Sequence, residues 1–171
     1  IFRKIMNEKA KYYIKKLQLE KHPEGGYFRE IYRSGEMISI EAPKKNFKRN
    51  VSTSIYFLLE GTQVSKFHRL KSDELWHFYD GGSVKVYVID EKGKLTEIIL
   101  GKKIEDGEVF QTVIKKNNWF AAEVINKRSF ALIGCTVSPG FDFSDFELAD
   151  RKYLLETFPK HTSLITEFTK P

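Results

Sequence analysis

The chain has 171 residues, a formal net charge of +6 and one cysteine, Cys135. This length fits one domain with its own hydrophobic core, and one cysteine excludes an intrachain disulfide, so a reducing, cytoplasmic compartment is the expected location. The basic residues fall in scattered clusters with acidic residues between them, which indicates a solvated surface rather than a nucleic-acid-binding protein. Apolar runs are only as long as strands, so no membrane association is expected.

The first expected element is a helix over residues 4–19, where apolar residues form a stripe among lysines. The proline and paired glycines of residues 22–26, HPEGG, end it. Nine short segments rich in β-branched and aromatic residues follow, bounded by turn residues, at 27–33, 52–59, 64–68, 74–80, 83–90, 95–100, 110–114, 119–124 and 130–137. Because no helical pattern lies between them, residues 27–137 predict an antiparallel sandwich or barrel.

The pattern changes again after Pro139 and Gly140. Ser144 is expected to cap a helix over residues 145–158, and a shorter helix is expected over residues 162–168. The whole chain, residues 1–171, is therefore predicted to be one all-β domain with short helices at both ends.

The central segments carry a spacing of glycine, histidine and glutamate. Gly61, His68, Glu74 and Gly81 follow one another at intervals that resemble the first cupin motif. Five stretches, at residues 22–29 (HPEGGYFR), 67–69 (FHR), 72–77 (SDELWH), 118–123 (NWFAAE) and 138–143 (SPGFDF), together resemble the uncharacterised "cupin-five" family. The resemblance implies a double-stranded β-helix, the cupin jelly roll, similar to that of dTDP-sugar epimerases. It also implies a homodimer, but no particular reaction.

Metal-binding cupins supply a His-x-His pair, a glutamate and a later histidine. By this resemblance, His68 and Glu74 match the first histidine and the glutamate, whereas Leu70 and Phe120 occupy the other two positions. Two missing ligands remove most of a transition metal's affinity unless His77 or Gln111 substitutes. We therefore expect a metal-free pocket and no cofactor.

Strand alternation places Glu74, Trp76 and Phe78 on one face of their segment, which predicts a carboxylate among aromatic rings inside the barrel. Such a group needs a partner or a ligand. His68 lies on the preceding segment and has two interpretations, a general base or a hydrogen-bonded histidine of the barrel wall.

Two further residues are candidates for catalysis. Tyr27 is a candidate to return a proton on the opposite side of a substrate. Asp142 is a candidate to orient His68, with helix capping as the alternative for it and the favoured role for Asp145.

Trp76 and Phe78 are expected to bind a ligand along the pocket wall, together with three further candidates. Gln111 is a polar residue in an apolar segment, and Trp119 is an aromatic residue that can stack on a ring. Arg29 shares a predicted strand face with Tyr27 and Arg33, so both arginines are either surface residues or anchors for a phosphate or carboxylate.

Three functions remain open from these residues. The first is a metal-independent epimerase or isomerase that acts on a sugar-like or nucleotide-sugar-like substrate. The second is a protein that binds a small metabolite without converting it. The third, a metal-dependent enzyme, is disfavoured by Leu70 and Phe120. A homodimer formed partly through edge strands is expected in each case.

Overall fold

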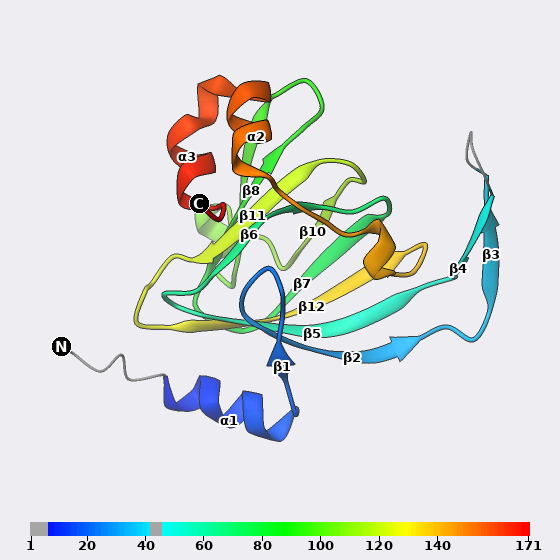
Figure 1. Cartoon of the computed structure of the whole chain (residues 1–171). Coiled ribbons are helices and arrows are strands. Elements are labelled where there is room, and N and C mark those ends of the chain that lie inside the picture. Colours follow the sequence, from blue (N-terminus) through cyan, green and yellow to red (C-terminus); the bar gives the residue numbers. More distant parts are fainter. Residues whose placement is uncertain (1–6, 42–45) are drawn as a thin grey trace.

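Two antiparallel sheets face each other and enclose the interior of the domain (Figure 1). The computed structural model describes residues 7–41 and 46–171. The first sheet has the order β1 (Glu20–Lys21), β2 (Tyr27–Arg33), β5 (Thr53–Glu60), β12 (Phe130–Ser138), β7 (Asp73–Gly81) and β10 (Gln111–Ile114). The second has the order β13 (Glu147–Leu148), β6 (Val64–Arg69), β11 (Trp119–Val124), β8 (Val84–Ile89) and β9 (Leu95–Leu100).

The predicted all-β jelly roll is confirmed. Each of the nine expected segments is a strand whose ends lie within one residue of the prediction. The sequence patterns do not identify the short strands β1 and β13, nor the hairpin of β3 (Met37–Ile40) and β4 (Phe47–Asn50). That hairpin extends away from the two sheets (Figure 1).

The three α-helices of the described residues lie towards the two ends of the chain. α1 (Glu8–Lys16) begins where the side chain of Asn7 accepts hydrogen bonds from the amides of Lys9 and Ala10. The predicted helix covers residues 4–19, of which residues 4–6 lie outside the described residues. Its predicted end is wrong, because the helix stops at Lys16 and Gln18 has a positive φ of 54°. α2 (Arg151–Thr157) and α3 (Thr162–Glu167) follow the sheets. Within the described residues there are also three short 3-10 helices: η1 (Ile104–Asp106) between β9 and β10, and η2 (Phe143–Asp145) and η3 (Pro159–His161) near the C-terminal end. None of the helices in the described part of the chain is long and apolar enough to span a membrane.

The predicted helix over residues 145–158 is wrong in its first half. Its expected cap, Ser144, lies inside η2, and Leu148 of β13 pairs with β6 instead of continuing a helix. α2 starts only after Asp150, whose carboxylate accepts a hydrogen bond from the amide of Tyr153 at 2.8 Å.

Strand alternation divides the apolar residues among three clusters. The largest lies between the sheets and includes Phe57, Trp76 and Ile133 from the first sheet, with Val86 and Phe120 from the second. A second cluster lies between the outer face of the second sheet and α2 and α3, and a third lies between the first sheet and α1. The helices therefore cover the outside of the barrel, and the interior between the sheets is left for the site.

Gly81, at the end of β7, is required by close backbone contact. Its φ is +104°, and a Cβ atom at this position would lie 2.1 Å from the carbonyl oxygen of Phe130. Gly107 also has a positive φ, +82°, but no atom lies within 4 Å of a Cβ built there. The two glycines thus separate the effect of backbone strain from the effect of a clash.

We expect Gly81→Ala to lower the free energy of unfolding by about 2–4 kcal/mol, because strain and a clash with main chain act together. Gly107→Ala should cost about 1 kcal/mol from strain alone. Urea unfolding followed by circular dichroism measures both. Equal losses in the two variants would show that the contact with Phe130 does not constrain the barrel.

Candidate functional site

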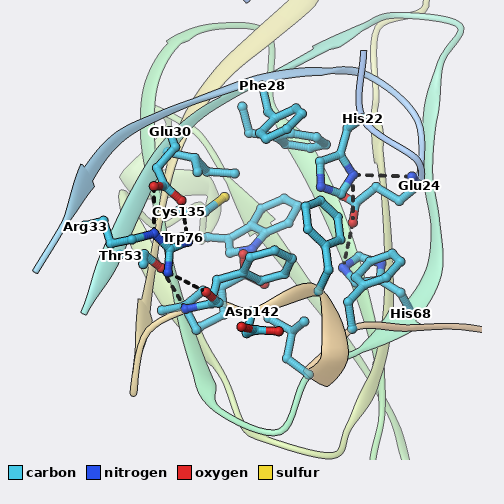
Figure 2. A pocket seen from close by; sticks show the side chains of 18 residues that line it. His22, Glu24, Phe28, Glu30, Arg33, Thr53, His68, Trp76, Cys135 and Asp142 are labelled. Atoms are coloured by element: carbon cyan, nitrogen blue, oxygen red, sulfur yellow. Dashed lines mark hydrogen bonds and ion pairs between the residues drawn. The ribbon is translucent and has the colours of Figure 1, made fainter. Parts of the chain in front are cut away.

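A cavity of about 300 Å³ lies inside the barrel, between the sheets and the segment that follows β12. Most of its wall is aromatic, from Phe28, Phe57, Trp76, Phe141, Phe143 and Phe146. Polar side chains gather at two places on this wall: His22, Glu24 and His68 on one side, and Glu30 and Arg33 on the other (Figure 2). Apolar walls with a few convergent polar groups are typical of small-molecule sites.

Glu24 and His68 form a buried ion pair. Nε2 of His68 lies 2.9 Å from Oε2 of Glu24, and Oγ of Ser65 donates to Oε1 of Glu24 at 2.7 Å. Nδ1 of His68 lies 2.7 Å from the carbonyl oxygen of Lys66. Burial disfavours charge on both groups, but their mutual attraction outweighs it, raising the pKa of His68 and lowering that of Glu24. Both nitrogens of the resulting imidazolium donate hydrogen bonds.

The loop at residues 22–26 brings Glu24 to this position. Gly25 has a φ of +120°, and a Cβ atom there would lie 2.1 Å from the carbonyl oxygen of Val64. Only a glycine allows the loop to lie this close to β6, where Ser65 and His68 are found. The sequence signal was the pair of glycines next to a histidine and a glutamate, but it does not reveal which strand the loop contacts.

His22 is the neutral member of this group. Its Nδ1 lies 3.3 Å from the amide nitrogen of Glu24 and 3.6 Å from Oε2 of the same residue. Burial lowers the pKa of His22, and the positive charge on His68 lowers it further, against the attraction of Glu24. An imidazole held neutral at the wall of a cavity is in the protonation state that a general base requires.

Glu74 and Trp76, from β7, carry unpaired polar atoms. Oε2 of Glu74 and Nε1 of Trp76 are buried and have no hydrogen-bond partner among the described residues. Burial raises the pKa of Glu74 to about 7, with repulsion from Glu24 acting in the same direction and attraction to His68 opposing both. The thiol of Cys135 lines the same cavity and stays protonated, because burial raises its pKa well above the ordinary value. Unpaired buried polar atoms mark a place where a ligand can bind.

Arg33 reaches the cavity because β2 contains a bulge. Glu30 pairs with Ile55 and Arg33 pairs with Thr53, so Ile31 is an extra residue in the strand. Regular alternation predicts Arg33 on the same face as Tyr27 and Arg29, and this prediction is wrong because the bulge reverses the alternation. Glu30 and Arg33 therefore line the cavity together.

Four of the residues predicted from sequence line the cavity: His68, Glu74, Trp76 and Asp142. Asp142 does not contact His68. Its Oδ1 accepts hydrogen bonds from the amide and the hydroxyl of Ser144, so it caps η2, and Glu24 contacts the histidine instead. Asp145, the other candidate for that role, forms an ion pair with Arg49.

The other five predicted residues lie elsewhere. Tyr27 packs against the cluster beneath α1, and Arg29 donates to Gln18 and to the carbonyl oxygen of Leu17, outside the barrel. Trp119 is buried on the outer side of the second sheet, with the guanidinium of Arg69 over its ring. Phe78 is part of the main core but does not line the cavity. Gln111 is exposed, since it pairs with His77 and shares the outward face of that residue.

The donor groups do not fit a resident transition metal. Both nitrogens of His68 are engaged in hydrogen bonds, and the ring of Phe120 lies 4.0 Å from the His68 ring. Leu70 lines the cavity as an apolar wall, and His77 faces outward towards Thr136. Within residues 7–41 and 46–171, no group of three or more His, Cys, Asp or Glu residues is arranged to hold a metal ion. The metal-free pocket stays a prediction, and no step below involves a metal.

The two-sheet jelly roll with a cavity between its sheets defines a cupin-type barrel. The chain belongs to the family described as "Cupin superfamily (DUF985)", whose model matches residues 11–149. The resemblance to a cupin family seen in the sequence is thereby confirmed.

Three similar proteins have names that state no activity. A solved protein of Shewanella oneidensis is 41% identical, with a TM-score of 0.84 over 95% of this chain and 98% of that one. A hypothetical protein of Leishmania major is 32% identical, with a TM-score of 0.86 over 95% and 99% of the two chains. An uncharacterized protein of Saccharomyces cerevisiae is 32% identical over 75% of this chain and 69% of its own length. These similarities support the family and the fold, and the function has to be argued from the site.

The raised pKa of Glu74 predicts a specific dependence of stability on pH. Between pH 4.5, its ordinary pKa, and about 7, the unfolded chain releases this proton while the folded chain retains it. The free energy of unfolding should therefore fall by about 3 kcal/mol as the pH rises through this window.

Glu74→Gln removes the titrating group, so the stability of the variant relative to the parent protein should increase as the pH rises from 5 to 8. Urea unfolding of both proteins at unit pH intervals measures this difference. Asp73→Asn is the matched control, because Asp73 is a partly exposed neighbour paired with Lys115. A difference that does not vary with pH would show that Glu74 titrates like an exposed carboxyl.

Proposed function

We propose that this protein is a metal-independent enzyme that moves a proton at a carbon next to a carbonyl group, as isomerases and epimerases do. The observation that carries the proposal is a pair of buried atoms at the cavity wall, Oε2 of Glu74 and Nε1 of Trp76, that have no well-formed hydrogen bond within the described residues. Both can donate a hydrogen bond when Glu74 is neutral, and burial favours its neutral form.

Such a pair of donors suits the oxygen of a substrate carbonyl. When a proton leaves the neighbouring carbon, negative charge develops on this oxygen, and donors fixed in an apolar cavity stabilise that charge. A carboxylic acid held neutral near pH 7 is an effective donor for this purpose. Trp76 supplies the second donor from the same face of β7.

His22 is the group that we assign as the base. In the free protein the amide of Glu24 donates to Nδ1 at 3.3 Å, so the proposed step uses the other tautomer of the ring. With its hydrogen on Nδ1, which lies 3.6 Å from Oε2 of Glu24, the ring can take the proton from the carbon on Nε2. The electron pair of the broken C–H bond moves into the bond to the carbonyl carbon, and the carbonyl becomes an enolate whose oxygen accepts hydrogen bonds from Glu74 and Trp76. Returning the proton to the same carbon gives exchange or epimerisation, and returning it elsewhere gives an isomer.

This assignment replaces two roles expected from sequence. His68 has no free nitrogen, because one contacts Lys66 and the other contacts Glu24, so it positions Glu24 rather than acting as the base. Tyr27 lies outside the barrel and does not face a substrate in the cavity. The engagement of both His68 nitrogens also favours the alternative function, a protein that binds a small carbonyl compound without converting it.

The test is exchange of a carbon-bound proton in deuterium oxide, followed by nuclear magnetic resonance. We choose phenylpyruvate and phenylacetone as probes because each has an acidic C–H next to a carbonyl and an aromatic ring suited to the walls. We expect exchange above the buffer rate for at least one probe, lowered about 100-fold by His22→Ala and by Glu74→Ala. Asp73→Asn should exchange at the parental rate.

Exchange at the buffer rate with both probes would contradict the enzyme. Saturable binding of a probe in that same experiment would then identify the alternative, a binding protein. Equal exchange by the parent and by Glu74→Ala would also contradict the role of the neutral carboxyl.

We also propose that two copies of the chain form a homodimer through the first sheet and the neighbouring hairpin of β3 and β4. Large side chains are exposed there at Ile31, Tyr32, Met37, Tyr79 and Val113, each between 43% and 54% accessible. β2 pairs with β1 only at Tyr27 and Phe28, so the rest of that edge of β2 has no neighbour in the first sheet within the described residues. An apolar face beside an open strand edge is commonly covered by a partner.

Light scattering at micromolar concentration should give the mass of two chains. The double variant Tyr32→Glu, Val113→Glu should give one chain, because it places charge in the proposed interface, whereas Tyr153→Glu, an exposed site on α2, should leave the dimer intact. A monomer in the parent protein, or a dimer that survives the double substitution, would contradict this interface.

A further inference from the structure

Glu30 and Arg33 form a bidentate pair on the wall of the cavity, on the side opposite His22, Glu24 and His68 (Figure 2). Nε of Arg33 donates to Oε1 of Glu30 at 2.9 Å, and Nη2 donates to Oε2 at 2.7 Å. This is the geometry with which a guanidinium recognises any carboxylate.

The guanidinium is held in place without Glu30. Nη1 of Arg33 donates to Oδ1 of Asn50 at 2.8 Å and to the carbonyl oxygen of Phe141 at 3.0 Å. Asn50 is fixed in turn by its bond to the carbonyl oxygen of Ser34, and Phe141 by its amide bond to the hydroxyl of Thr53. The Nε and Nη2 edge would therefore keep its direction if Glu30 left, as a preorganised binding group must.

Glu30 can be displaced at low cost. Its side chain is 36% exposed, and within the described residues its hydrogen bonds are those to Arg33 alone. Solvent screens an ion pair this accessible, so it is weaker than a buried pair even with its two-pronged geometry. A short turn of the side chain brings the carboxylate into water and opens the arginine edge to the cavity.

We propose that this edge of Arg33 is a subsite for a carboxylate group of the ligand, and that Glu30 fills it in the free protein. This subsite rests on the proposed function, which supplies the carbonyl group at the opposite end of the ligand. Together the two ends define a small carboxylic acid with a carbonyl group and an apolar or aromatic body.

Charge at the subsite favours a carboxylate over a phosphate. Asp142 also lines the cavity, and it is ionised because the hydrogen bonds from Ser144 lower its pKa, with a smaller contribution from the positive charges of Arg49 and Arg33. Exchanging Glu30 for a ligand carboxylate leaves the balance of charge unchanged. A doubly charged phosphate would add a negative charge next to Asp142, which is unfavourable.

The experiment compares phenylpyruvate, which has the carboxylate, with phenylacetone, which lacks it, in calorimetric binding to the full chain. The parent protein should bind phenylpyruvate about tenfold or more tightly than phenylacetone, because a hydrogen bond to a charged group is lost in the second case. Arg33→Ala should abolish this preference, and Arg33→Lys should reduce it, since lysine keeps the charge but not the two-pronged edge.

Glu30→Gln should increase the preference for phenylpyruvate, whereas Arg33→Ala removes it. The substitution does not alter the groups that contact Arg33 from Asn50 and Phe141. It should strengthen phenylpyruvate binding several-fold and leave phenylacetone binding unchanged, because the internal competitor loses its charge. Arg29→Ala is the matched control from the same strand, and it should bind both probes as the parent protein does, since Arg29 points out of the barrel. Thermal unfolding confirms that each variant is folded.

A preference for phenylpyruvate that persists in Arg33→Ala, or that does not grow in Glu30→Gln, would overturn the subsite. Tighter binding of phenyl phosphate than of phenylpyruvate would overturn the choice of a carboxylate. If phenylpyruvate binds through Arg33 but exchanges its proton at the buffer rate, the result supports the subsite and contradicts the proposed enzymatic activity. If both probes bind equally well and exchange their protons equally fast, the result supports the enzymatic activity and contradicts the subsite.

Discussion

The site depends on the buried ion pair between Glu24 and His68, because it fastens the loop at residues 22–26 to β6 and so completes one wall of the cavity. Removing either partner would leave the other as an uncompensated buried charge, which costs about 3–5 kcal/mol in comparable pairs. The pair also sets the electrostatics of its surroundings. At Glu74 the attraction of the imidazolium and the repulsion of the carboxylate act in opposite directions, so burial remains the largest cause of its raised pKa. The ion pair thus allows a neutral acid to exist beside two charged groups.

An apolar interior separates two groups of charged side chains in the barrel. On one side, charges are paired internally and saturated with hydrogen bonds, as at His68. On the other, the pair of Glu30 and Arg33 is partly open to solvent and exchangeable. The aromatic rings between them, among them Phe28 and Trp76, exclude water and strengthen any electrostatic contact that a ligand makes. Both ends are built on strands of the barrel or on a loop fixed against it, which limits how far the polar groups can shift.

Strand alternation alone was sufficient to predict the parts of the site that lie on regular strands. Glu74 and Trp76 face the cavity as their two-residue spacing indicated, because β7 is regular across both positions. Arg33 could not be placed in this way, since one extra residue at Ile31 reverses the faces of β2, and nothing local in the sequence marks that bulge. The position of Glu24 at the cavity could not be predicted for a different reason. Its position depends on a contact between a glycine loop and a strand 41 residues further along the chain, and such long-range contacts are not contained in a periodic pattern.

The two tryptophans of the chain differ in one respect that has an optical consequence. The indole nitrogen of Trp76 is unpaired at the cavity wall, whereas Trp119 is buried outside the cavity beneath the guanidinium of Arg69. Indole emission responds to hydrogen bonding and to the polarity around the ring. Occupation of the cavity should therefore change the fluorescence of one tryptophan against a constant background from the other. A protein with Trp119 replaced by phenylalanine would carry a single intrinsic reporter inside its own binding site, and compounds could be screened against it without any label.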